Sequence, residues 1–190
     1  MWPWGHAAVG YLLCALWVRA RYGRAPTAGA VLPLAVGTQF PDLLDKPLAW
    51  TFGVLPSGRA GAHSLLVAVP LLALLWWRVD SAAARRAWAG FALGYLAHLA
   101  TDGLYPLLDG DFSGLAYLFW PILSLPPYDE SAGILAHFAA AELTAALLAE
   151  VGLFAVATVV WAADGAPGLR TVGRWCKRRA AVATAALSGR

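Results

Sequence analysis

Apolar runs separated by short polar segments occupy most of the chain. An apolar run bounded by charged residues, glycine or proline predicts a helix between those boundaries. On this basis the sequence predicts apolar helices over residues 2–18, 26–40, 62–77, 87–101 and 131–163. The stretch 42–61 combines charged residues with several Gly and Pro, so we expect a loop that folds back into a membrane interface. Residues 115–125 are apolar but too short to cross a bilayer.

The composition assigns these helices to a membrane protein. Hydrophobic residues make up 60% of the 190 residues and charged residues 13%, whereas a soluble domain has about 45–50% apolar and about 25% charged residues. There are too few polar side chains to cover the surface of a soluble protein. The high apolar content also excludes intrinsic disorder. We therefore expect an all-α fold, a multi-pass transmembrane helical bundle with about five crossings plus a re-entrant or interfacial segment. Several runs are shorter than the roughly 20 residues of a straight span, so their helices should extend into the polar flanks.

The positions of Lys and Arg predict an orientation, because short loops rich in these residues stay in the cytoplasm. With the N-terminus outside and five crossings, 12 of the 14 basic residues are cytoplasmic, and only Lys46 and Arg59 lie outside. The sequence thus predicts a cell-membrane protein with a membrane-embedded domain over residues 1–167 and a basic cytoplasmic tail over residues 168–190. The lipid bilayer is the expected partner, with the tail against anionic headgroups, and no nucleic acid is expected to bind.

Five ionisable residues lie at the outer ends of these predicted helices, namely His6, Asp42, His63, His98 and Asp102. His98 and Asp102 are four residues apart, which places an imidazole and a carboxylate on one face of a helix. Ionisable groups at membrane depth are costly and tend to be functional. Because imidazole and carboxylate are ligands for transition metals, we expect the five residues to bind a divalent metal ion. Zinc is the first choice, with manganese and iron as alternatives.

Small residues continue two of the same helical faces. Gly90 and Gly94 precede His98 at four-residue intervals, and Gly10 follows His6 at the same spacing. Small side chains let a neighbouring helix approach closely. We therefore expect close helix packing to hold the metal-binding residues in place.

The order of the candidate residues resembles a known family. The motifs that carry the resemblance are His6, Gly37-x3-Pro41-Asp42, Gly58-Arg59-x3-His63-Ser64 and Gly94-x3-His98-x3-Asp102. Over roughly residues 1–110 they resemble the membrane-bound metal-dependent hydrolase family, which implies a metal-dependent hydrolase. A more distant likeness is to the zinc-dependent phospholipase C superfamily, whose multinuclear zinc site cleaves phosphoesters. That superfamily has a further His-x-x-x-Glu, but Ala141 stands four residues after His137 here, so the likeness implies one or two metal ions rather than three.

The leading interpretation is a hydrolase of an ester or phosphoester, including lipid-linked ones, at the extracytoplasmic interface. Asp45 is expected to be a further ligand or the general base, and Arg59 to hold a substrate phosphate. The alternative is a non-enzymatic membrane protein, a regulator-binding, structural or transport component, that retains the metal site. A cytoplasmic protein partner would then bind its Arg-rich loops and tail. The sequence contains no motif for a Ser or Cys nucleophile, a Walker loop or a dinucleotide.

Overall fold

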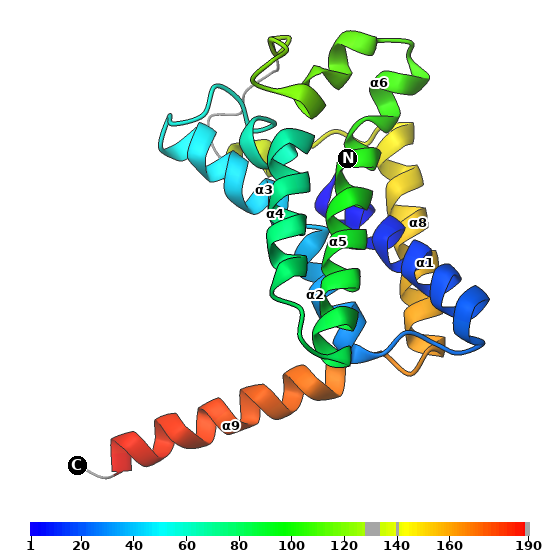
Figure 1. The fold of residues 1–190 in the computed structure, drawn as a ribbon, viewed down its shortest axis with the longest axis vertical. Coiled ribbons are helices and arrows are strands. Elements are labelled where there is room, and N and C mark those ends of the chain that lie inside the picture. Colours follow the sequence, from blue (N-terminus) through cyan, green and yellow to red (C-terminus); the bar gives the residue numbers. More distant parts are fainter. Residues whose placement is uncertain (128–133, 140, 189–190) are drawn as a thin grey trace.

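The protein is built from α-helices joined by short 3-10 and π-helical turns (Figure 1). The computed structural model describes residues 1–127, 134–139 and 141–188, and these residues form no β-strand. The elements are α1 (Pro3–Tyr22), α2 (Ala28–Gly37), α3 (Phe40–Lys46), η1 (Pro47–Thr51), η2 (Gly61–His63), α4 (Leu65–Trp77), α5 (Ala82–Asp102), α6 (Leu104–Leu108), η3 (Phe112–Phe119), α7 (Ile134–Ala139), α8 (Ala145–Ala163) and α9 (Leu169–Ser188).

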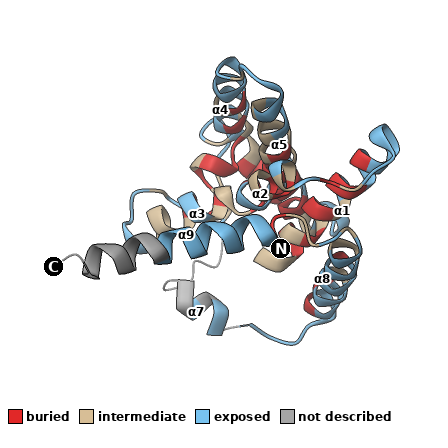
Figure 2. Ribbon diagram, turned by 90° about the horizontal axis from the view of Figure 1, so that it is seen from below, coloured by how far each residue is buried: buried red, intermediate tan, exposed pale blue. Residues whose placement is uncertain are grey.

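The core forms where α1, α2 and α5 meet, and α8 packs along α1 with most of its own surface exposed (Figure 2). The helices α2 and α5 approach at backbone distance. A Cβ atom at Gly94 would collide with the carbonyl oxygen of Leu34, and one at Gly90 with that of Ala30. The expected close packing of the small-residue stripe is therefore confirmed for α5, and its partner is α2.

Capping side chains set the helix ends around the core. The Ser81 hydroxyl accepts a hydrogen bond from the backbone N–H of Ala84 at 3.1 Å and begins α5. The Ser64 hydroxyl accepts from the N–H of Leu66 at 3.1 Å and begins α4 directly after His63. The Ser64 cap leaves His63 at the entrance of α4, and Asp102 is the last residue of α5.

The expectation of about five membrane crossings is wrong. Within the described part of the chain, α8 is the one helix that is long and apolar enough to cross a membrane. The helices α2 and α4 have 10 and 13 residues, fewer than the roughly 20 that a span requires. The longer α1 and α5 both carry Arg and His within their length, so their composition is not that of a span. The predicted orientation of the two termini depended on five crossings and loses its basis with them.

Two predicted boundaries also differ from the structure. The sequence predicts a loop over 42–61, but residues 40–51 are helical, as α3 and η1. Proline opens both elements, and proline is tolerated in the first turn because the N–H there needs no partner. The sequence also predicts one long helix over 131–163, whereas α7 and α8 are separate. The Thr144 hydroxyl accepts a hydrogen bond from the N–H of Leu147 at 3.1 Å and begins α8 there.

Candidate metal centre

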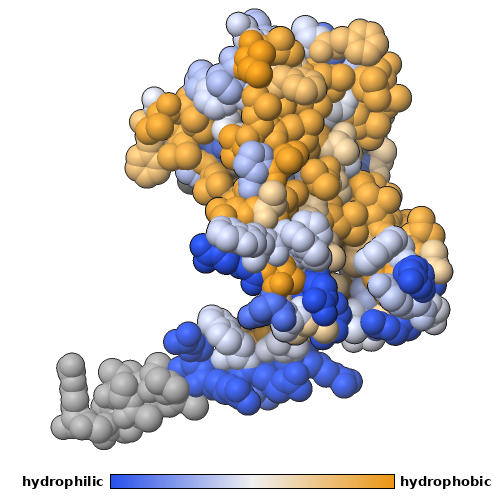
Figure 3. Space-filling view, in the orientation of Figure 1, coloured by the Kyte–Doolittle hydropathy of each residue, from blue (hydrophilic) through white to orange (hydrophobic). Residues whose placement is uncertain are grey.

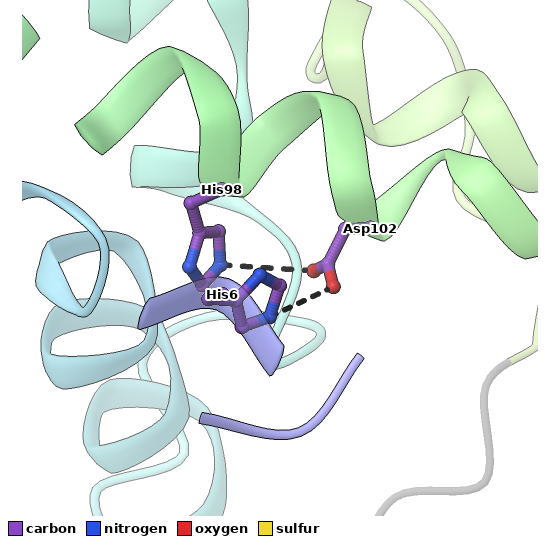
Figure 4. Close-up of side chains that lie close together, drawn as sticks. All are labelled: His6, His98 and Asp102. Atoms are coloured by element: carbon purple, nitrogen blue, oxygen red, sulfur yellow. Dashed lines mark ion pairs between the residues drawn. The ribbon is translucent and has the colours of Figure 1, made fainter. Parts of the chain in front are cut away.

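The structure brings the five predicted metal-binding residues together from four elements. His6 comes from α1, Asp42 from α3, His63 from η2, and His98 and Asp102 from α5. Figure 4 shows His6 reaching the face of α5 that His98 and Asp102 share. The three histidines are at most 1% exposed, so their ring nitrogens have left water and require partners within the protein.

The imidazoles of His63 and His98 are each held from behind through Nδ1. Nδ1 of His98 lies 2.7 Å from the carbonyl oxygen of Thr38, and Nδ1 of His63 lies 2.7 Å from Asp45 Oδ2. The Asp45 carboxylate also accepts the backbone N–H groups of Ala62 and His63, at 2.9 and 3.0 Å. Since these oxygens are acceptors, both Nδ1 atoms must be donors. Nδ1 therefore carries a proton in each ring, and Nε2 points into the centre.

His6 is held in the same way through a hydroxyl group. The Thr101 hydroxyl donates to the carbonyl oxygen of Ala97 at 2.9 Å, so it accepts from Nδ1 of His6 at 2.8 Å. Nε2 of His6 is buried and has no hydrogen-bond partner among the described residues. Its nearest charged neighbour is Asp102 Oδ1 at 3.3 Å. In the neutral ring both of these atoms are acceptors. Asp102 Oδ1 also accepts from the N-terminal ammonium group of Met1 at 3.0 Å, which supplies positive charge beside it.

The Nε2 atoms of all three histidines and the two carboxylates converge on one small region. The Nε2 atoms of His63 and His98 are 3.1 Å apart. Asp42 Oδ1 lies 3.5 and 3.8 Å from these two atoms, and Asp102 Oδ2 lies 3.4 and 3.8 Å from them. Ligand atoms about 2.0–2.1 Å from a tetrahedral zinc are about 3.3 Å from one another. The spacing of the donor atoms therefore fits a transition-metal ion.

Opposite charges balance the two carboxylates in the centre. Burial favours a neutral imidazole at His63, but hydrogen bonds with Asp102, Asp42 and Asp45 outweigh burial and raise the pKa of His63 to about 10. Burial acts to raise the pKa of Asp102, but above all the Arg59 guanidinium holds that pKa well below its usual range. Without a metal ion, a proton on His63 thus supplies positive charge between the carboxylates.

Two overlapping groups of donor atoms are compact enough for a metal ion. One consists of His6, His98 and Asp102 and the other of Asp42, His63 and His98, with the donor atoms of each within 4.8 Å of one another. His98 belongs to both groups. Nitrogen and oxygen donors of this kind suit zinc, manganese or iron, so the residues fit the metal that the sequence leads us to expect.

Asp45 and Arg59 lie around the ligand set rather than within it. The Asp45 carboxylate is behind His63, where three N–H groups occupy it. Nε of Arg59 lies 3.5 Å from Asp102 Oδ2, and the side chain is 30% exposed. The ammonium group of Lys46 lies 2.7 Å from Asp42 Oδ2 on the other side. Asp45 is therefore placed to orient a ligand, and Arg59 is placed at the border between the centre and solvent.

A cavity of about 350 Å³ opens beside the centre. Its walls combine charged, aromatic and apolar side chains, among them Lys46, Arg59, Asp102, Trp2, Trp50, Tyr105, Leu147 and Glu150. Glu150 comes from α8 and is 4% exposed. It accepts hydrogen bonds from the Tyr105 hydroxyl at 2.9 Å and from the backbone N–H of Trp2 at 2.8 Å. The cavity thus connects the centre with α8, the candidate membrane span.

Sequence reasoning missed several residues that support the centre. Thr38 acts through its backbone carbonyl, which has no sequence signature. Thr101 acts through a hydroxyl group three residues after His98, and Thr is too common near His for that spacing to be informative. Lys46 did carry a signal, because its i, i+4 spacing from Asp42 places both on one helical face.

The fold and the centre define an all-helical protein with a buried His/Asp cluster beside one helix that has the length and composition of a membrane span. The family described as YdjM inner membrane protein matches residues 1–185. The chain belongs to that family, and this membership agrees with the membrane association expected from the sequence. No curated protein and no solved structure matches the chain significantly.

Proposed function

We propose that the protein is a membrane-bound, metal-dependent hydrolase whose ligands are His6, Asp42, His63, His98 and Asp102. The observation that carries the proposal is the convergence of three buried imidazoles, each fixed through Nδ1 and each presenting Nε2 to the same region. A histidine that binds a metal ion through one ring nitrogen is characteristically oriented by a hydrogen bond from its other ring nitrogen. The two carboxylates in the same region carry negative charge, which favours the binding of a cation between them.

Zinc is the proposed ion, with manganese and iron as alternatives. The donor set is mixed nitrogen and oxygen, which all three ions accept. His98 belongs to both compact donor groups, but its Nε2 atom offers one lone pair. The two groups therefore do not each hold an independent three-ligand ion, and we propose about one or two ions per chain, with His98 bound to one of them.

The chemistry combines a bound ion with side chains that are already in place. A bound zinc ion supplies a water of lowered pKa and polarises an ester or phosphoester oxygen. Asp45 keeps the proton on Nδ1 of His63 and fixes the orientation of the ring. Arg59 lies at the edge of the cavity, where its planar guanidinium can bind a phosphate of the substrate through two hydrogen bonds. Lys46 neutralises Asp42 and lines the same cavity.

The proposed substrate is an ester or phosphoester that carries an apolar group, such as a lipid-linked one. The cavity beside the centre is lined by Trp2, Trp50 and Leu147 as well as by charged residues. One of its walls is α8, the candidate membrane span. A substrate with a charged head and an apolar tail therefore matches the two kinds of surface that the cavity offers.

The proposal is tested on the full chain purified in detergent. Elemental analysis should find about one or two equivalents of a transition metal. Hydrolysis of bis-(p-nitrophenyl) phosphate or a p-nitrophenyl ester should stop after chelation and return with added zinc. The variant His98→Ala should lose both metal and turnover, while Asp109→Ala, on an exposed turn outside the centre, should keep both.

Two results would contradict the proposal in different ways. Failure to retain or take up zinc, manganese or iron would remove the metal centre itself. Full metal retention without hydrolysis of either ester would instead support the non-enzymatic alternative, a membrane component that keeps a metal site.

A further inference from the structure

The helix α9 has two unlike faces. Leu169, Val172 and Trp175 follow one side of it and are 60%, 44% and 58% exposed. Cys176 lies on the same side, four residues after Val172. The other side is basic and consists of Arg170, Arg174, Lys177 and Arg178. Arg179 follows Trp175 by four residues on the apolar side, and its guanidinium lies over the Trp175 ring at 5.4 Å. No acidic residue occurs in the sequence after Asp164. Such a helix has the pattern of one that lies in a membrane interface rather than in a protein core.

A tight turn fixes the start of α9 at the end of α8. Residues 164–168 join the two helices, and the indole N–H of Trp161 donates to the carbonyl oxygen of Pro167 at 3.1 Å. Gly165 and Gly168 have φ values of +81° and +98°, which glycine adopts without strain. A Cβ atom at Gly168 would lie 2.9 Å from Cδ2 of Leu32, so the turn also packs against α2. The position of α9 is thus tied to the end of the candidate span.

The direction of α9 differs from that of the helices it follows. In Figure 1, α8 and α5 run along the long axis of the body, and α9 runs across it and away from it. A helix that crosses a bilayer ends at its surface. The candidate span of this inner membrane protein is α8. A helix that follows it after a five-residue turn and runs crosswise has the direction of a helix that lies along that surface.

Basic side chains from other elements gather at the same end of the molecule. Figure 3 shows hydrophilic residues at this end and on the described part of α9, below a body surface that is largely hydrophobic. Arg24, Arg85 and Arg86 line a cavity of about 430 Å³ there. None of these three is within ion-pair distance of a carboxylate in the described part of the chain. The end that carries α9 is therefore complementary to an anionic surface.

We propose that α9 lies in the plane of the membrane surface and binds anionic phospholipid headgroups, with its apolar face in the headgroup–acyl boundary. Each Lys or Arg near an anionic leaflet strengthens binding about fivefold, and the apolar face adds the burial of Leu169, Val172 and Trp175. The proposal does not depend on the metal centre, which lies at the other ends of α1 and α5.

The test places a fluorophore on either face of α9 in the full chain, reconstituted into nanodiscs of phosphatidylcholine with or without phosphatidylglycerol. In a Cys14→Ala background the label on Cys176 reports the apolar face. In a Cys14→Ala/Cys176→Ala background, Arg178→Cys reports the basic face. With phosphatidylglycerol, the Cys176 label should be shielded from a water-soluble quencher, and the label at position 178 should remain quenchable.

The charge contribution is tested with Arg174→Gln/Lys177→Gln, which should lower the ratio of shielded to exposed label at Cys176 about 25-fold. Thr171→Gln, on the polar side without loss of charge, should leave the ratio unchanged. Metal content measured in the same discs should not change in either variant, which separates this proposal from the hydrolase proposal.

Three outcomes would overturn the proposal. Equal quenching at both positions in both lipids would place α9 in water. Shielding at Cys176 that does not respond to phosphatidylglycerol or to the charge variant would exclude anionic headgroups as the ligand. Equal shielding at both positions in both lipids would mean that protein, either this chain or a partner, covers the helix on both faces.

Discussion

The helices α5 and α8 are similar in length, 21 and 19 residues, and both are rich in alanine, yet they face different surroundings. The buried residues of α5 include Gly90, Gly94, His98 and Asp102, which contact other helices or build the metal centre. On α8 only Leu147, Glu150 and Ala157 are buried. Val160 and Trp161 pack partly against the core, and most of the other apolar side chains are exposed. Apolar length alone therefore does not distinguish a helix that builds a site from a helix that meets lipid.

The distinction lies in where small and ionisable residues fall along each helix. On α5 they repeat every four residues, so they share one face and bring α2 to backbone distance. On α8 the single glycine, Gly152, has open space where a Cβ atom would be, and the single charged residue, Glu150, is turned toward the cavity. Four comparisons between the two helices test whether this contrast is real.

The largest effect is expected from exchanging glycine for leucine on the two helices. In Gly94→Leu the new side chain meets the carbonyl oxygen of Leu34 and the backbone N of Thr38. Since backbone cannot move aside as a side chain can, α2 and α5 must separate, at a cost of about 3 kcal/mol or more. Gly152→Leu meets nothing and should gain up to about 1 kcal/mol of helix propensity.

Thermal unfolding in detergent, followed by circular dichroism, checks this pair. The contrast fails if both variants unfold at the temperature of the parent protein, or if Gly152→Leu is the more damaging of the two. Metal content should follow stability, being lost in Gly94→Leu and kept in Gly152→Leu.

The next effect concerns the carboxylates of the two helices. Asp102→Ala removes a ligand and leaves Nε2 of His6, His63 and His98 around an underfilled site, so zinc affinity should fall by more than the roughly 10–100-fold of a supporting residue. Glu150→Gln on α8 changes only a wall of the cavity and should change affinity less than about tenfold. Competition with a fluorescent zinc chelator measures both, and comparable losses in the two variants would mean that α8 shares in the ligand set.

The sequence allowed the five candidate metal-binding residues to be selected, because each has a recognisable position in the predicted helices. The four-residue spacing of His98 and Asp102 predicts a shared helical face, and the glycines before them predict close packing. His6, Asp42 and His63 could be added because each lies at the end of a predicted helix. The count of crossings, by contrast, was read from apolar content, which α5 and α8 share. Only the packing of α5 against α1 and α2 shows that its apolar residues face protein.

The residues that hold the imidazoles in place, such as Thr38 and Asp45, could not be assigned from the sequence, and the reason is a different one. Thr38 contributes a carbonyl oxygen, which every residue has, and its role depends on α2 ending beside α5. Asp45 was singled out from the sequence as a further ligand or the general base, but a pattern does not reveal that its carboxylate lies behind His63, against Nδ1. These assignments require distances between segments that are far apart in the chain.

A smaller effect is expected from matched threonines on the two helices. Thr101 on α5 and Thr158 on α8 each donate a hydrogen bond to the carbonyl oxygen four residues earlier. Thr101→Val removes the acceptor of Nδ1 of His6 and should weaken zinc binding about 10–100-fold. Thr158→Val removes the same local bond with no ligand behind it, so zinc affinity should stay at the parental value. Equal affinities in the two variants would show that Thr101 does not orient His6.

The effect of pH is the smallest when it is counted per unit of pH, and it concerns zinc binding at α5 and membrane binding at α8. In the metal-free centre the pKa of His63 is raised to about 10, so the ring carries an extra proton at neutral pH that zinc must displace. Below that pKa, each increase of one pH unit should therefore raise the apparent zinc affinity about tenfold. The dependence should flatten as the pH approaches 10, because His63 has then lost the proton. The exposed face of α8 holds no ionisable side chain, so retention of the chain in nanodiscs should not change over the same range. Zinc titrations against a chelator of known proton affinity, at one-unit steps of pH, measure the slope. A zinc affinity independent of pH would mean that the metal-free centre holds no displaceable proton on His63, and the convergence of Nε2 atoms would then need another cation to explain it.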